Sequence, residues 1–198
     1  MRVKQIFLYS FDELSDEAKE KAIDSLRNSE SYLNYDWYDS VYEDAKEIGK
    51  IMGIEIDKIY FSGFSSQGDG ACFEGSYHYR PGCMKDLKAY APKGTELHDI
   101  CSRLIAEQRK NFYRITATIK QRGHYMHSGC TQIDVSRSDW AYYIAPSNEQ
   151  DITDLLREFM DWIYGQLETE YDYLMSDEAV RECIECNAYE FTAEGEWS

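Results

Sequence analysis

Two stretches of the sequence hold side chains whose types are typical of catalysis. Residues 60–82 read "YFSGFSSQGDGACFEGSYHYRPG" and hold a thiol between two carboxylates, and residues 122–130, "RGHYMHSGC", hold two imidazoles. A cysteine nucleophile needs a nearby base that lowers its pKa. If the two loops meet in space, they form the polar set of a hydrolase or transferase. The members of this alternative catalytic set are Asp69, Cys72, Glu74, His124 and His127.

The spacing within residues 60–82 favours a structural role for the segment. His78 shares a strand face with Cys72, but six residues separate them, at ~3.3 Å each in an extended chain. The glycines match neither a phosphate loop, which requires a following "GK[ST]", nor "GxGxxG" before a helix. We therefore expect a β-hairpin with a strand ending near "YFSGF", a turn at "SSQGDG" and a return strand at "ACFEGSYHY". The preferred interpretation assigns no catalytic residue.

Histidine and cysteine spacing also allows a four-coordinate zinc site. "HYMHSGC" and "CIEC" supply ligand types that Zn²⁺ prefers, provided that the two segments meet in space. The CxxC falls in a predicted helix, where cysteines three residues apart also serve as small core residues. The preferred interpretation therefore has no metal and no cofactor. The ligands of the alternative are His124, His127, Cys130, Cys183 and Cys186.

Hydrophobic periodicity predicts an α+β fold. The predicted strands cover residues 3–11, 54–61, 71–79 and two segments within 112–135, with a further strand at 139–145. The predicted helices cover residues 14–29, 36–53, 95–111 and most of 151–198, and residues 84–94 hold a short helical turn that Pro92 ends. We expect a central antiparallel sheet with acidic amphipathic helices packed on one face and at both ends. These elements form a single domain, residues 1–198, with an α+β body (1–148) and an acidic helical layer (149–198).

Helix ends are marked by capping residues. Ser15, Thr95 and Ser176 are predicted N-caps, because a hydroxyl there accepts a hydrogen bond from a free backbone N–H. Gly53 is a predicted C-terminal stop. The caps at Ser15 and Ser176 share the sequence "SDEA", which we interpret as similar capping chemistry rather than a repeat.

Charge is distributed unevenly along the chain. The net charge is −16; residues 12–47 carry 12 acids and 4 bases, residues 50–148 carry 10 and 13, and residues 149–198 carry 15 and 2. Such a balance disfavours direct binding to nucleic acid or to an anionic membrane. The basic residues of the middle segment either hold an anionic substrate or pair with the acidic helices. Such pairing can occur within one subunit or between two, so the pattern is compatible with a homodimer.

The acidic helices are the predicted partner-binding surfaces. Carboxylates three or four residues apart form rows of negative charge, which suit the basic groove of a nucleic-acid-binding protein. Aromatic residues interleave with them in "YDWYDSVYED" and "ETEYDYL", as is common for interface anchors. The competing interpretation is that these faces are solvated and serve solubility. The predicted residues are Asp36, Asp39, Glu43, Asp44, Glu47, Glu168, Glu170, Asp172, Asp177, Glu178, Glu182 and Glu185.

Several segments together resemble a family of small bacteriophage and prophage proteins, some of which carry an antitoxin label. The segments are "YDWYDSVYEDAK", "YFSGFSSQGDGACFEGSY", "RGHYMHSGCT" and "YDYLMSDEAV", so that the resemblance spans nearly the whole chain. It implies a phage origin and a setting in the host cytoplasm, which agrees with an N-terminus that has no apolar run typical of a signal peptide. It implies no role for any individual residue.

These observations lead to one preferred function and two alternatives. The preferred function is a phage-derived acidic interaction protein that inhibits a host nucleic-acid-binding defence protein by presenting DNA-mimicking carboxylates, as an anti-CRISPR or anti-restriction protein does. The expected partner is that host protein, with no direct nucleic acid and no membrane. The alternatives are a hydrolase or transferase with its site at the 62–77 and 122–130 loops, and an antitoxin that neutralises a basic toxin.

Overall fold

The computed structural model describes residues 6–139 and 144–197. The chain divides into two compact units, which we describe separately. Residues 38–168 form the sheet unit, and residues 1–37 with 169–198 form the terminal unit. Helix α5, Pro146–Leu174, contributes to both units. The single domain expected for residues 1–198 stays a prediction.

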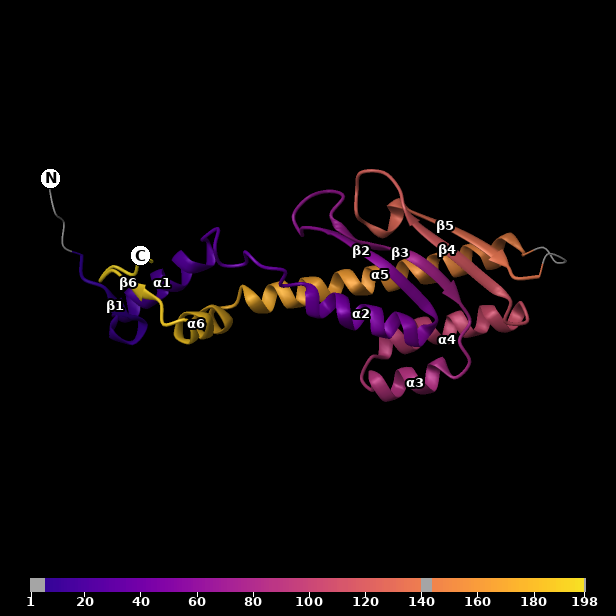
Figure 1. The fold of residues 1–198 in the computed structure, drawn as a ribbon, viewed down its shortest axis with the longest axis horizontal. Coiled ribbons are helices and arrows are strands. Elements are labelled where there is room, and N and C mark those ends of the chain that lie inside the picture. The colour runs from indigo at the N-terminus through magenta and orange to yellow at the C-terminus, as the bar shows by residue number, and fades with distance from the viewer. Residues whose placement is uncertain (1–5, 140–143, 198) are drawn as a thin grey trace. The chain divides into compact units, whose positions relative to one another are not determined.

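The sheet unit contains a four-stranded antiparallel sheet (Figure 1). Its strands, in spatial order, are β2 (Ile54–Ser62), β3 (Gly70–His78), β4 (Ile115–Gln121) and β5 (Thr131–Arg137). The hairpin predicted from the 60–82 segment is confirmed, because β2 and β3 pair antiparallel with Ser62 opposite Gly70. The α+β class with a central antiparallel sheet is likewise confirmed.

Helices cover one face of this sheet. They are α2 (Asp39–Met52), α4 (Thr95–Lys110) and the first part of α5, and α3 (Cys83–Tyr90) packs against α2 and α4. The rings of Phe73 on β3 and Phe159 on α5 meet edge to face with centroids 6.0 Å apart. Gly53 ends α2 in the left-handed conformation, as predicted. Thr95 is the first residue of α4 and the cap position is Gly94, so the predicted cap at Thr95 is wrong by one residue.

A β-bulge keeps the apolar residues of β2 on the covered face. The pairing with β3 shifts between Ile56 and Lys58, so that both Ile54 and Ile59 point into the core despite their odd spacing. The strands approach so closely here that a Cβ on Gly75 would lie 1.9 Å from the carbonyl oxygen of Glu55. Only glycine fits at this position.

A buried glutamine joins α4 to the start of β4. The side-chain amide of Gln108 donates to the carbonyl of Ile115 (2.8 Å), and the N–H of Ile115 donates back to Gln108 Oε1 (3.2 Å). Gln108 is fully buried, so these bonds satisfy polar groups that water cannot reach. The intervening turn places Phe112 and Tyr113 at positive φ, a conformation that the two bonds help to hold.

The terminal unit is built from both ends of the chain. It contains β1 (Tyr9–Ser10), the 3₁₀ turn η1 (Phe11–Glu13), α1 (Asp16–Arg27), α6 (Asp177–Cys186) and β6 (Glu190–Phe191), with β1 antiparallel to β6. The hydroxyls of Ser15 and Ser176 accept from Ala18 and Ala179, which confirms both predicted caps. Its core gathers around Phe11, Leu26, Ile184 and Phe191.

Some predictions concern residues that lie partly outside the described ranges. The predicted strand at 3–11 is observed at Tyr9–Ser10, and residues 1–5 are not described. The predicted strand at 139–145 falls largely on residues 140–143, which are also outside. Among the residues that are described, no helix has the length and apolar character that a membrane span requires.

Candidate partner-binding surface

Helix α6 presents a stripe of three carboxylates on its outer face. Helical periodicity of 3.6 residues per turn turns its buried residues Ala179, Val180 and Ile184 toward the core. Glu178, Glu182 and Glu185 follow one another at i, i+4 and i+7 on the opposite side, and all three are exposed. We call these three residues the α6 stripe.

The α6 stripe has no ion-pair partner among the described residues. The one basic residue of α6, Arg181, lies over the ring of Phe11, 5.9 Å from its centroid. Like charges at i and i+4 repel each other unless an opposite charge intervenes. The stripe is therefore a row of carboxylates whose negative charge faces outward.

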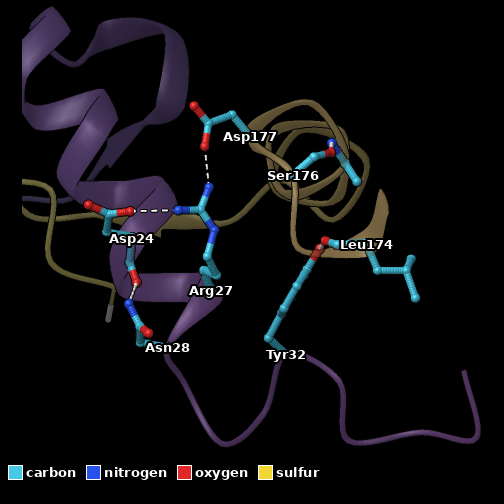
Figure 2. A network of polar contacts seen from close by, with 8 residues as sticks. Asp24, Arg27, Asn28, Tyr32, Leu174, Ser176 and Asp177 are labelled. Carbon is cyan, nitrogen blue, oxygen red and sulfur yellow. Dashed lines mark hydrogen bonds and ion pairs between the residues drawn. The ribbon is translucent and has the colours of Figure 1, made fainter. Parts of the chain in front are cut away.

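Arg27 organises the polar contacts of the terminal unit (Figure 2). Its guanidinium lies between two carboxylates, donating to Asp24 at 2.8 Å and to Asp177. The ion pair joins the last turn of α1 to the first turn of α6. Asp177 belongs to the predicted partner-binding set, and its observed contact gives it a structural role within the unit.

Tyr32 fixes the end of α5 in the same network (Figure 2). Its hydroxyl donates to the carbonyl oxygen of Leu174 at 2.6 Å, and the ring belongs to the core. Burial, followed by the neighbouring Cys183 and Tyr35, raises the pKa of Tyr32 to about 12. The phenol therefore stays protonated at neutral pH and remains a donor.

Two tyrosines add exposed aromatic surface beside carboxylates. Tyr35 is 60% exposed and Tyr173 is 51% exposed. Partial burial, and after it the charges of Cys183 and Glu170, raise the pKa of Tyr35. Tyrosines of this kind are frequent anchors in protein–protein interfaces.

The carboxylates predicted on α2 have a different setting. Asp39, Glu43 and Glu47 are exposed on one face of the helix, but Lys46 and Lys50 lie on the same face. Lys50 Nζ is 4.0 Å from Glu47. The α2 face is therefore of mixed charge.

The remaining members of the predicted set lie in both units. Asp44 accepts a hydrogen bond from the hydroxyl of Tyr90 at 2.7 Å, which raises the pKa of that tyrosine. Asp36, Glu168 and Asp172 are exposed, and Glu170 is half-buried. The twelve carboxylates thus divide between the two units.

The carboxylates and the thiol of the alternative catalytic set make structural contacts. Burial raises the pKa of Cys72, which is 1% exposed and lies beside Thr131. The carboxylate of Asp69 accepts from the N–H groups of Ser65 and Ser66 and so closes the β2–β3 turn. Glu74 accepts from the hydroxyl of Tyr60 at 2.9 Å. No contact of these residues supplies Cys72 with a base.

The histidines of that set lie in the β4–β5 loop. His127 Nε2 is 3.3 Å from Cys130 Sγ, while Nδ1 accepts from the N–H of Gly129 at 3.1 Å. Because Nδ1 is an acceptor, the proton of the neutral ring is on Nε2 and points at the sulfur. His127 therefore cannot take the thiol proton of Cys130 in this arrangement. His124 is exposed, 6.0 Å between ring centroids from Tyr125.

The alternative zinc ligands lie in different units. His124, His127 and Cys130 belong to the sheet unit, whereas Cys183 and Cys186 lie on α6 in the terminal unit. Within residues 6–139 and 144–197, no three His, Cys, Asp or Glu side chains form a group suited to a metal ion.

Sequence reasoning missed Arg27, Tyr32 and a pair of adjacent cysteines, Cys83 and Cys101. Asp24 and Arg27, three residues apart, could have indicated an ion pair within α1. The contact of Arg27 with Asp177 and that of Cys83 with Cys101 join separate helices, so no local pattern signals them.

Comparison with known proteins identifies the family. No curated protein and no solved structure matches the chain. Residues 37–177 match the Domain of unknown function (DUF8835). This range includes the whole sheet unit and extends to the first residue of α6. This range exceeds two thirds of the sequence, and the chain therefore belongs to the DUF8835 family.

Proposed function

We propose that the protein is an acidic interaction protein of phage origin that inhibits a host nucleic-acid-binding defence protein. In this proposal the terminal unit docks into the basic groove that otherwise holds DNA or RNA. The phage origin rests on the sequence resemblance, and the mode of binding rests on the surface of α6.

The observation that carries the proposal is the unpaired α6 stripe. Its three carboxylates are spaced at about 6 Å and 4.5 Å along the helix axis, from a rise of about 1.5 Å per residue. A helix holds them in fixed register, as a nucleic-acid strand holds its phosphates. Basic grooves bind such regular anions through side chains of Lys and Arg, with a strong dependence on salt.

The charge of the terminal unit supports the same choice of surface. Its 67 residues carry 17 acids and 6 bases, a net charge of −11. The 131 residues of the sheet unit carry 20 acids and 15 bases, a net charge of −5. A basic partner is therefore attracted most strongly to the terminal unit, which also offers Tyr35 and Tyr173 as anchors.

A capture experiment from bacterial lysate tests the function. The tagged full-length protein is incubated with lysate at low salt, washed, and eluted first with duplex DNA and then with high salt; mass spectrometry identifies each fraction. We expect a nucleic-acid-binding protein in the DNA eluate. A basic toxin that DNA does not release would support the antitoxin alternative instead. A preparation that retains no nucleic-acid-binding protein would contradict the proposal.

Charge reversal then locates the surface. Glu178→Lys, Glu182→Lys and Glu185→Lys are combined in one variant, and Asp39→Lys, Glu43→Lys and Glu47→Lys in a matched control on α2. Both variants change the net charge equally and alter only exposed positions. We expect the α6 variant alone to lose capture. Equal loss in both variants would indicate attraction to the overall charge rather than a specific surface.

A further inference from the structure

Two buried thiols lie side by side in the sheet unit, whereas the α6 stripe belongs to the terminal unit. The Sγ atoms of Cys83 and Cys101 are 3.8 Å apart, and both side chains are buried. Cys83 is the first residue of α3, and Cys101 lies in the second turn of α4. A disulfide requires a sulfur separation of about 2.05 Å. A displacement of less than about 2 Å would therefore bring the two sulfurs to bonding distance.

The surroundings distinguish the two thiols. The S–H of Cys101 donates to Cys83, and the N–H groups of Cys83 and Met84 with the charge of Arg80 add to this effect. Together they lower the pKa of Cys83 to about 7, although burial opposes the shift. The same contact and burial raise the pKa of Cys101 far above its usual range. Cys83 is therefore the thiol of the pair that ionises near neutral pH, and the thiolate is the nucleophile.

A surface groove borders Cys83, which is itself 3% exposed. The groove has a volume of about 560 Å³, and Tyr79, Cys83, Lys85 and Lys88 are among its lining residues. Both lysines are exposed, so the lining of the groove carries positive charge. An oxidant with carboxylates fits this setting better than a neutral one.

We propose that Cys83 and Cys101 are a thiol–disulfide modification site, which an anionic small-molecule disulfide such as glutathione disulfide oxidises to an intramolecular disulfide. The site is independent of the proposed partner-binding function.

The exchange proceeds in two balanced steps. The Cys83 thiolate attacks one sulfur of glutathione disulfide; a mixed disulfide forms, the S–S bond of the reagent breaks and one glutathione thiolate leaves. Loss of the Cys83 negative charge removes a cause of the raised pKa of Cys101. The Cys101 sulfur then loses its proton, attacks Cys83 and expels the second glutathione. The two protein sulfurs together lose two electrons and one glutathione disulfide is reduced to two glutathiones. The proton that Cys101 releases passes to one departing thiolate, and the other takes a proton from water.

Peptide mapping of the oxidised wild-type protein tests the site directly. The folded full-length protein is incubated with glutathione disulfide, quenched in acid, alkylated and digested with trypsin. We expect the six free thiols to fall to four, with residues 59–85 linked to residues 94–103. Because Cys72 shares the first peptide, tandem fragmentation must place the bond at Cys83. Oxidation elsewhere with this pair still reduced, or a mixed disulfide that persists at Cys83, would overturn the proposal.

Single variants separate the two steps. In Cys101→Ala, the mixed disulfide at Cys83 should accumulate, and the pH at which Cys83 reacts at half its maximal rate should rise above about 7, because the S–H donor is lost. In Cys83→Ser, Cys101 should stay reduced. Cys186→Ser, which removes an exposed thiol of the terminal unit, should leave the linkage unchanged. Far-UV circular dichroism checks that each variant is folded.

A comparison of two reagents tests the groove. In a variant with Lys85→Glu and Lys88→Glu, oxidation by glutathione disulfide should slow by about threefold or more, since the attraction to its carboxylates becomes repulsion. Oxidation by the neutral 2-hydroxyethyl disulfide should change much less. Equal slowing of both reagents would exclude recognition of the oxidant by the lysines.

Discussion

The sheet unit and the terminal unit use their charged residues differently. In the sheet unit, Arg103 donates to both oxygens of Glu158, at 2.6 and 2.8 Å, and also contacts Asp99 at 3.2 Å. In the terminal unit, α6 carries an outward row of carboxylates with no basic partner among the described residues. Net charge alone therefore does not identify a binding surface. The decisive feature is whether the charges are already paired within the fold.

Basic residues of the segment 50–148 are also paired with acids within the sheet unit. Lys110 pairs with Glu107 at 2.5 Å, and Arg80 pairs with Asp86 at 3.2 Å. These contacts agree with the interpretation that basic residues of this segment balance nearby acids. They leave less of the basic charge available for an anionic macromolecule.

Removal of a core aromatic from either unit should have the largest effect. Phe73→Ala in the sheet unit and Phe191→Ala in the terminal unit each delete a fully buried ring, at a cost of about 3–5 kcal/mol. Hydrogen exchange of the full-length protein should show lost protection mainly in the unit that carries the substitution. Equal loss throughout both units in each variant would show that they unfold as one, and the comparison would fail.

The buried glutamine of the sheet unit should have the next largest effect. Gln108→Ala leaves the N–H and carbonyl of Ile115 without their partner, and we expect destabilisation of about 2–3 kcal/mol. Gln132→Ala, at an exposed position of β5, is the control and should change stability by less than about 0.5 kcal/mol. Chemical denaturation measures both; similar values would argue against the role given to Gln108.

Loss of the α6 cap should have a moderate effect. Ser176→Ala removes the acceptor for the N–H of Ala179, which typically costs about 1 kcal/mol. Ser176→Asp keeps an acceptor and should restore most of the loss. If Ser176→Asp were as unstable as Ser176→Ala, the cap would not be the reason for the effect.

Neutral substitutions should have the smallest effects, and their signs should differ between the units. Glu182→Gln relieves repulsion from Glu178 and Glu185 and should stabilise the protein by up to about 0.5 kcal/mol. Glu158→Gln weakens the pair with Arg103, and because both groups are well exposed the loss should stay below about 1 kcal/mol. Thermal unfolding at low salt measures both. Destabilisation by Glu182→Gln would mean that the α6 stripe has a partner within the fold.

Local patterns predicted the parts of the fold that depend on neighbouring residues. The hairpin follows from two β-rich runs around a glycine-rich turn, and the caps at Ser15 and Ser176 follow from single hydroxyls before acidic first turns. The outward direction of the α6 stripe follows from helical spacing alone. These features need no information about distant parts of the chain.

Contacts between distant residues were beyond such patterns. The pairing of Tyr9 with Phe191 joins the two ends of the chain, and no periodicity signals it. The bulge in β2 shifts the pairing between Ile56 and Lys58, and the strand prediction did not include it. The contact of Cys83 with Cys101 depends on how α3 packs on α4. Each of these is decided by tertiary packing, which single-sequence reasoning does not supply.

The most direct test of the central claim is the affinity of the captured partner for three forms of the protein. They are the wild type, the α6 triple reversal and the α2 triple reversal, compared by titration calorimetry at low and high salt. We predict that the α6 reversal weakens binding by about tenfold or more at low salt, whereas the α2 reversal has a small effect. Unchanged affinity of the α6 variant, with its fold intact, would contradict the assignment of the α6 stripe as the binding surface.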